Sequence, residues 1–173
     1  MANKFSVGRE QEIKVLNGLI KRNFDANLYL CYDSEGDEES QTIEISDGFF
    51  LRCPDIEVYE NRSLNIHLMR VEVKSFKYPY TNSTGKLGSR ISEEIDFVTI
   101  KKVQLDDYLS LQSYEEIECR VVFVIRRGEN KGVYWNTLDN LLNTKHVIGD
   151  AYGDGFEHYV WRLKDMIIGL DSF

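Results

Sequence analysis

Two short stretches of the chain carry acids and a lysine in an order that suits phosphate chemistry. Asp55 follows a proline, and Glu72 and Lys74 alternate with valines further along. Successive side chains of a β-strand point to opposite faces, so Glu72 and Lys74 would share one face. If the two stretches pair as an antiparallel hairpin, joined by the polar residues 60–63, Asp55 and Glu72 can converge on one divalent cation. Carboxylates with room left for water and phosphate are the ligands that Mg²⁺ prefers.

Such a site would hydrolyse phosphodiester bonds. Mg²⁺ lowers the pKa of a bound water and stabilises the charge that develops on the phosphate oxygens, and we expect Mn²⁺ to be able to replace it. The predicted ligands are Asp55, Glu72 and the carbonyl group of Val73. Lys74 would orient the attacking water or stabilise the developing negative charge.

The order Pro54-Asp55, then Glu72-Val73-Lys74, resembles the PD-(D/E)XK nuclease superfamily. Gln104-x-x-x-Tyr108 places two side chains one helical turn apart, and it is similar to the Gln-x-x-x-Tyr motif of the RecB-like branch. The resemblance spans residues 8–125. It implies an α/β restriction-endonuclease-like core, in which a central mixed β-sheet is flanked by helices, and a metal-dependent nuclease activity.

The first helix is predicted over Asn3–Arg22, and it contains an acid among apolar positions. At helical spacing Glu12 falls within the apolar stripe formed by Ile13, Leu16, Leu19 and Ile20. One interpretation is an edge position, with the carboxylate reaching solvent or Arg9. The resemblance implies another, in which Glu12 faces the acidic cluster and holds its waters or a second ion.

Contacts with the substrate are expected from the segment that follows the lysine. The loop Lys77–Arg90 interleaves tyrosines and glycines with cations, which suits stacking on bases and binding of phosphates, although an ordinary polar loop has the same composition. A helix is predicted over 92–112, with a buried stripe that includes Val103, Leu105, Tyr108 and Leu111. Gln104 would contact the scissile phosphate. The predicted substrate-binding residues are Lys77, Lys86, Arg90, Lys101 and Tyr108.

The remaining pattern predicts strands over 27–32, 41–46, 49–59, 64–76, 119–126, 132–135 and 158–163, and a short helix over 138–142. Pro54 cannot donate to a ladder, so it should lie at an edge or a bulge that re-aims Asp55. The nearly continuous apolar run 119–126 is typical of a strand covered on both faces. Asp150 and Asp154 could in principle bind metal, but we interpret residues 149–155 as a glycine-rich turn.

Size and composition favour one folded domain. The chain has 173 residues, of which 42% are hydrophobic, so we predict a single nuclease-like domain over residues 1–173. No apolar run approaches the ~20 residues of a membrane span, and Met1–Arg9 lacks the apolar core of a signal peptide, which predicts a cytoplasmic protein without a membrane partner. The three cysteines lack metal-binding spacing and are expected to be buried thiols.

The net charge of −8 weighs against a strongly basic nucleic-acid surface, but the charge is unevenly distributed. Five acids fall within residues 33–39, whereas the segment 74–90 contains four cations and no acid. The resemblance implies a Mg²⁺-dependent nuclease, and we expect it to act on DNA rather than RNA. Two alternatives remain open at this point: a nuclease-like binding or assembly module without activity, and an RNA endonuclease of the cap-cleaving kind. A homodimer is also left open.

Overall fold

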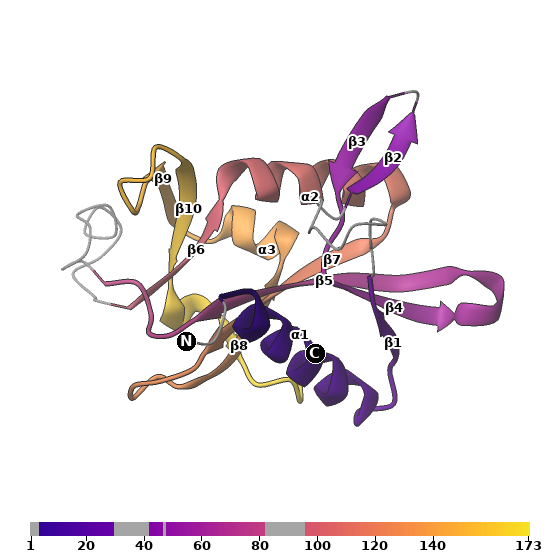
Figure 1. Cartoon of the computed structure of the whole chain (residues 1–173), viewed down its shortest axis with the longest axis horizontal. Coiled ribbons are helices and arrows are strands. Elements are labelled where there is room, and N and C mark those ends of the chain that lie inside the picture. The colour runs from indigo at the N-terminus through magenta and orange to yellow at the C-terminus, as the bar shows by residue number, and fades with distance from the viewer. Residues whose placement is uncertain (1–3, 30–41, 47, 82–95) are drawn as a thin grey trace. The chain divides into compact units, whose positions relative to one another are not determined.

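The computed structural model describes residues 4–29, 42–46, 48–81 and 96–173 of the chain (Figure 1). The chain forms two compact units, each built from two separate segments of the sequence. The first unit comprises residues 1–73 and 107–120, and the second comprises residues 74–106 and 121–173. Strands β5 (Ile66–Phe76) and β7 (Glu118–Ile125) and helix α2 (Lys102–Glu115) each contribute residues to both units.

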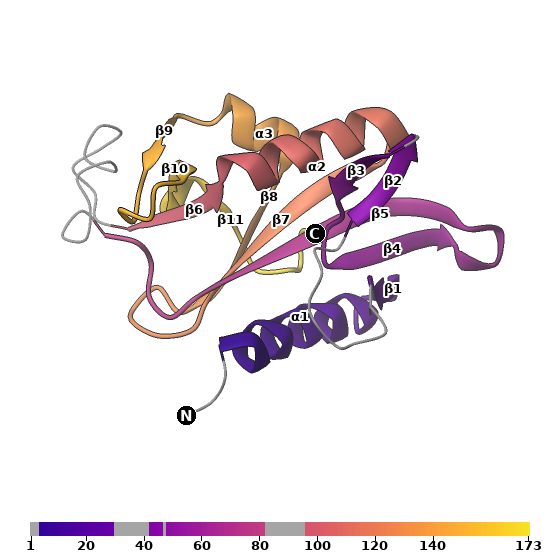
Figure 2. The ribbon, with the colours of Figure 1, turned by 45° about the horizontal axis from the view of Figure 1, so that its top comes forward.

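The first unit is built on an antiparallel arrangement in which β4 lies between β1 and β5, and β5 is also the neighbour of β7. Its other elements are α1 (Lys4–Ile20), β1 (Asp25–Leu28), β2 (Thr42–Ser46), β3 (Phe49–Arg52), β4 (Ile56–Asn61) and the 3-10 turn Arg62–Leu64. Strands β2 and β3 form a separate two-stranded sheet. Within this unit, α1 runs along one side of β4 and β5, and the last turns of α2 lie on the other side (Figure 2).

The pleat of β4 and β5 sorts their side chains by polarity. Ile56, Val58, Met69 and Val71 are buried on alternate positions. Acids and an arginine occupy the intervening positions, on the face toward α2. This alternation, which is typical of a strand with two different faces, is what places charged groups in the interior of the first unit.

The second unit contains a three-stranded antiparallel sheet in the order β6 (Phe97–Lys101), β10 (Glu157–Arg162), β9 (His146–Asp150). It also holds β8 (Gly132–Thr137), which lies between β7 and β11 (Ile167–Ile168), and α3 (Leu138–Asn143). This helix was predicted over 138–142, and the Thr137 hydroxyl caps it by accepting the N–H of Asn140. A 3-10 turn, Leu163–Asp165, follows β10.

The fold is α/β with a mixed central sheet flanked by helices, which confirms the predicted fold class. Strand β7 is buried at six of its eight positions, and this confirms that both of its faces are covered. Cys53 and Cys119 are buried free thiols, as predicted, while Cys31 lies outside the described residues. Among the described helices, none is long and apolar enough to cross a membrane.

The predicted helix 92–112 is wrong in its first half. Phe97, Val98, Thr99 and Ile100 are all buried and form β6, which pairs with β10. The helix begins only at Lys102, and the predicted start at residue 92 lies outside the described residues. Val103 is 59% exposed, so the buried stripe of α2 consists of Leu105, Tyr108 and Leu111. A four-residue β-branched and aromatic run outweighs helical periodicity once a partner strand is available.

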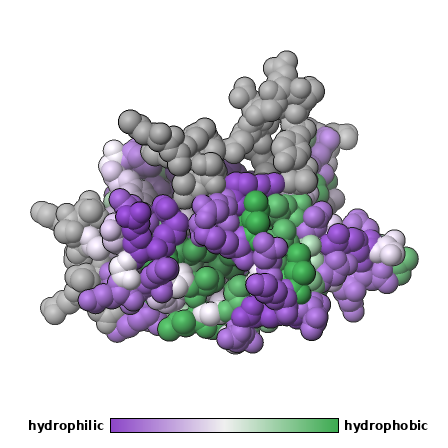
Figure 3. Space-filling model, turned by 60° about the horizontal axis from the view of Figure 1, so that its bottom comes forward, coloured by the Kyte–Doolittle hydropathy of each residue, from purple (hydrophilic) through white to green (hydrophobic). Residues whose placement is uncertain are grey.

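The single strand predicted over 49–59 is also wrong, because the chain leaves the strand at Cys53-Pro54-Asp55. The residues before this break pair with β2, and those after it pair with β1 and β5. The buried face of α1 is rotated as well. It consists of Gln11, Val15 and Leu19, whereas Ile13 and Ile20 are exposed. Figure 3 shows apolar side chains interspersed among polar ones on one face of the molecule.

Candidate active site

The two acids of the predicted site meet across β4 and β5. Ile56 pairs with Val71 in an antiparallel register, so Asp55, one residue earlier, and Glu72, one residue later, come to the same level. The Asp55 carboxylate accepts a 2.7 Å hydrogen bond from the backbone N–H of Val73. This contact holds the Asp55 side chain beside the strand that carries Glu72.

Asp55 is also fixed through its main chain. Its carbonyl oxygen accepts the N–H of Tyr29 at 2.9 Å, just beyond the end of β1. Pro54, which has no N–H to donate, is buried immediately before it. The break at Pro54 therefore takes Asp55 out of the regular ladder and lets its side chain reach the amide of Val73.

Glu72 is buried inside the first unit, next to the hydroxyl of a tyrosine. Its exposed fraction is 3%, and that of Tyr108 on α2 is 1%. The Tyr108 hydroxyl lies close enough to Glu72 to donate a hydrogen bond to it. Burial raises the pKa of Tyr108 well above its usual value, and the charges of Glu72 and Asp55 and the hydrogen bond to Glu72 raise it further, while Arg52 opposes them. Both carboxylates therefore raise the pKa of the same group, the Tyr108 hydroxyl.

The donor set fits a divalent cation of the magnesium type. Asp55 and Glu72 offer hard oxygen atoms, and both carboxylates lie near the Tyr108 hydroxyl. Glu12 does not complete a group of three acids with them. In the described part of the chain, the only set of three or more metal-binding side chains with ligand atoms within 4.8 Å of one another is elsewhere. The Glu12 carboxylate pairs with Arg9 at 2.9 Å on α1.

The other predicted residues are distributed along β5, α2 and β6. Lys74 follows Val73 on β5 and is partly exposed, and Gln104 is partly exposed in the first turn of α2. Lys77 is exposed, with its Nζ atom 5.7 Å from the centroid of the Tyr78 ring. The Nζ atom of Lys101, the last residue of β6, lies 3.8 Å from the Phe156 ring. Lys86 and Arg90 lie outside the described residues.

The sequence prediction missed a buried arginine beside the two acids. Arg70 lies on β5 two residues before Glu72, on the same face, and is 3% exposed. Its guanidinium group donates two hydrogen bonds to Glu115, at 2.7 and 2.8 Å, and one to Glu57 at 2.9 Å. It also donates to the sulfur of Cys53 at 2.9 Å. Strand alternation alone could have placed Arg70 on the face of Glu72.

These bonds tie the elements of the first unit together. Glu57 comes from β4, Arg70 from β5 and Glu115 from the last turn of α2. Glu57 also accepts hydrogen bonds from the Tyr59 hydroxyl at 2.7 Å and lies 3.2 Å from Nε2 of His67. A β-bulge in the pairing of β4 with β5 brings His67 to this side of the sheet. The network therefore fixes α2, and with it Tyr108, over the strand that carries Glu72.

Comparisons with known proteins bear on the fold. The sequence matches no family profile and no curated protein. Hjc, a Holliday junction resolvase from the archaeal hyperthermophile Archaeoglobus fulgidus, has a similar structure, with a TM-score of 0.52 at 11% identity over 93% of this chain and 90% of Hjc. D212, a nuclease from a fusselovirus, gives a TM-score of 0.51 at 14% identity over 97% of this chain and 89% of D212.

Both similar structures have the PD-(D/E)XK nuclease fold. At these levels of identity the similarity concerns the fold, and it does not extend to the Gln104-x-x-x-Tyr108 motif. Sequence and structure agree on the central point, since β4, which directly follows Asp55, pairs with β5, which carries the Glu72-Val73-Lys74 run. The chain therefore has the restriction-endonuclease-like fold of the PD-(D/E)XK nucleases.

Proposed function

We propose that the chain is a metal-dependent nuclease that hydrolyses phosphodiester bonds in DNA rather than RNA. The observation that carries this proposal is the convergence of Asp55 with the buried Glu72 at the Tyr108 hydroxyl. This convergence occurs in a fold shared with a junction resolvase and a viral nuclease. Lys74 follows on the same strand, in the order that the sequence pattern requires.

The chain's own residues have distinct roles in this proposal. Asp55 and Glu72 hold Mg²⁺ or Mn²⁺, with the Val73 carbonyl as a third ligand. When bound, the ion supplies a water of lowered pKa and a positive charge beside the phosphate. The N–H of Val73 orients the Asp55 carboxylate, and the Tyr108 hydroxyl orients Glu72. Lys74 orients the attacking water or stabilises the negative charge that develops on the phosphate.

The remaining predicted residues contact the substrate around this centre. Glu12 holds waters or a second ion, and Gln104 contacts the scissile phosphate. Flanking phosphates and bases meet the other predicted contact residues, which are Lys77, Lys86, Arg90 and Lys101. Tyr108, which the sequence also suggested as a contact, is 1% exposed and acts through Glu72 instead. Nucleic-acid binding by such cations is salt dependent, so a variant that lacks one of them should show weaker binding and a smaller salt slope.

The test is cleavage of plasmid, single-stranded and branched DNA, with RNA digested in parallel, in Mg²⁺ or Mn²⁺ and in EDTA. We expect DNA to be cut only with metal, and Asp55→Asn, Glu72→Gln and Lys74→Ala to abolish cutting. Glu60→Gln and Lys131→Ala are matched controls, because they remove the same charges at exposed positions and should cut normally. Cleavage that survives in all three site variants would refute the assigned centre.

A metal-binding readout separates loss of catalysis from loss of the site. Mg²⁺ or Mn²⁺ should raise the melting temperature of the unmodified chain, because an ion that binds only the folded state stabilises it. The effect should disappear in Glu72→Gln and persist in Lys74→Ala. If no substrate is cut while the metal still binds, the chain is a nuclease-like binding module. If RNA alone is cut, the preference for DNA is wrong.

A further inference from the structure

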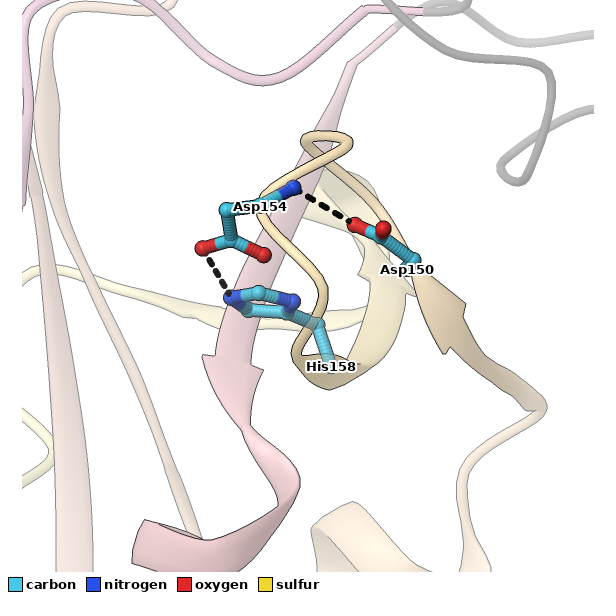
Figure 4. Close-up of side chains that lie close together, drawn as sticks. All are labelled: Asp150, Asp154 and His158. Carbon is cyan, nitrogen blue, oxygen red and sulfur yellow. Dashed lines mark hydrogen bonds and ion pairs between the residues drawn. The ribbon is translucent and has the colours of Figure 1, made fainter.

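A second group of metal-binding side chains lies at the turn between β9 and β10. Asp150 is the last residue of β9, His158 is the second residue of β10, and Asp154 lies between them. One ligand atom from each of the three lies within 4.8 Å of the others. Figure 4 shows the Asp154 carboxylate turned toward the imidazole of His158. All three residues belong to the second unit, whereas Asp55 and Glu72 belong to the first.

Asp150 is held in place by the backbone of the turn. Its Oδ1 atom accepts the N–H groups of Tyr152, Gly153 and Asp154, and, among the residues that the structure describes, its Oδ2 atom accepts one hydrogen bond, from the N–H of Gly155 at 3.1 Å. Burial acts to raise the pKa of Asp150, but these four hydrogen bonds hold it below the usual value. Asp150 is thus a fixed carboxylate, and its Oδ2 atom retains a free lone pair.

His158 is the buried member of this group. Its side chain is 3% exposed, and its Nδ1 atom lies 2.9 Å from the carbonyl oxygen of Phe156. A carbonyl can only accept, so Nδ1 donates this hydrogen bond, and Nε2 is the ring atom that remains to face Asp154. This Nε2 atom faces Asp154 Oδ2 at 4.0 Å, beyond hydrogen-bond distance. An ion placed between the buried Nε2 atom and the Oδ2 atom of the exposed Asp154 would be bound by both side chains.

We propose that Asp150, Asp154 and His158 bind a divalent transition-metal ion of the zinc class. Imidazole favours Zn²⁺ over Mg²⁺ and Ca²⁺, which prefer oxygen ligands alone. A metal-binding histidine usually donates its other ring N–H to a carbonyl or a carboxylate, as His158 does to Phe156. Two carboxylates and one imidazole also neutralise the charge of a divalent ion and leave a position for water.

The distances are compatible with this assignment after a small closure of the turn. Bonds of about 2.0–2.2 Å to nitrogen and oxygen place two tetrahedral ligands about 3.4 Å apart. The observed Nε2–Oδ2 separation of 4.0 Å is thus close to that required. Asp154 follows Gly153 and precedes Gly155, both of which have positive φ angles. The proposed ion would cross-link the end of β9 to the start of β10.

The chain contains three histidines, so imidazole NMR can test the site directly. His146 is a matched internal control, because its Nδ1 atom also lies 2.8 Å from a carbonyl, that of Thr144. Its ring neighbours are Tyr159 and Trp161 rather than a carboxylate. Addition of one equivalent of Zn²⁺ at pH 7.5 should shift the His158 resonances and leave those of His146 unchanged. Mg²⁺ should shift neither.

Variants then define the ligands. Asp154→Asn and His158→Gln should lose saturable Zn²⁺ binding measured by calorimetry, whereas His146→Gln should retain it. Asp154 is 37% exposed, so Asp154→Asn should fold even if the buried His158→Gln does not. Glu72→Gln should keep the His158 shift, which separates this site from the proposed nuclease centre. The proposal is overturned if Zn²⁺ leaves His158 unperturbed, if it shifts His146 equally, or if Asp154→Asn binds as tightly as the unmodified chain.

Discussion

Replacement of Arg70 by alanine should destabilise the protein more than any exposed charge change. The guanidinium group is 3% exposed and bonds Glu115 and Glu57, whose own side chains are 15% and 13% exposed. Burial acts to lower the pKa of Arg70, but the hydrogen bonds and charges of its partners raise it, so the group is charged at any accessible pH. Arg70→Ala would leave two largely buried carboxylates without their counter-ion.

The magnitude follows from this arrangement. Removal of one partner of a buried ion pair destabilises a protein by about 3–5 kcal/mol, because an uncompensated charge remains inside. For a chain of this length, 1 kcal/mol corresponds to about 2–4 °C in melting temperature, so the midpoint should fall by about 6–20 °C. Arg62→Ala is the control. Arg62 pairs with Asp25 at 2.6 Å, but both side chains are about half exposed, and such pairs contribute about 0–1 kcal/mol.

The assay is equilibrium unfolding in urea, followed by tryptophan fluorescence and by circular dichroism. A second substitution makes the test more specific, since Glu115→Gln in the Arg70→Ala background removes one of the two carboxylate charges that have lost Arg70. The double variant should therefore recover part of the lost stability, although Glu115→Gln alone is destabilising. The reasoning is wrong if the free energies of unfolding of Arg70→Ala and Arg62→Ala differ by less than 1 kcal/mol. It is also wrong if the double variant is no more stable than Arg70→Ala, because Arg70 would then not be the buried counter-ion of Glu115.

Three further predictions concern single side chains. Tyr108→Phe removes the hydrogen bond to buried Glu72 and should lower the free energy of unfolding by about 1–3 kcal/mol. Its effect on Mg²⁺ binding should be smaller than that of Glu72→Gln. An unchanged urea midpoint would contradict this prediction. Burial, with the hydrogen bond and charge of its Glu57 partner, raises the pKa of Tyr59 to about 12, so its stabilising contribution is complete below pH 10 and is lost as the pH rises from 10 to 12. Tyr59→Phe should flatten the fall of the melting temperature over that range, and parallel curves would refute the assignment. Burial also raises the pKa of the Cys119 thiol, so a thiol reagent at pH 8 should modify Cys119 only after urea unfolds the chain.

The closeness of Asp55 to the strand that carries Glu72 could be predicted because its determinants are local. Alternation along β5 is enough to place Glu72 and Lys74 on one face, and Pro54 marks the point at which the preceding strand must end. The convergence of Asp55 with Glu72 then requires only the hairpin pairing of β4 with β5, which is a short-range contact.

Features that depend on distant pairing could not be predicted in the same way. The Phe97–Ile100 run is buried at every position and so shows neither strand nor helix periodicity; only its pairing with β10 makes it a strand. Gln11 lies in the buried stripe of α1, and a buried polar residue is invisible to a hydrophobic pattern. The grouping of Asp154 with His158 likewise depends on a turn whose flanking strand β9 was not predicted.

The interruption at Pro54 has a consequence for how this protein can change. The carboxylate of Asp55 is immobilised from two directions, by the Tyr29 amide on its main chain and the Val73 amide on its side chain. Neither hydrogen bond comes from the β2–β3 hairpin, which precedes the break and forms its own small sheet, although Ile43, Ile45 and Leu51 of this hairpin pack with Tyr29 and Leu111. The exposed end of the hairpin, at Phe49 and Phe50, can therefore acquire new surface chemistry over evolutionary time without displacing the acid. The protein thus has a hairpin end whose sequence can vary, while the position of Asp55 stays fixed by two hydrogen bonds.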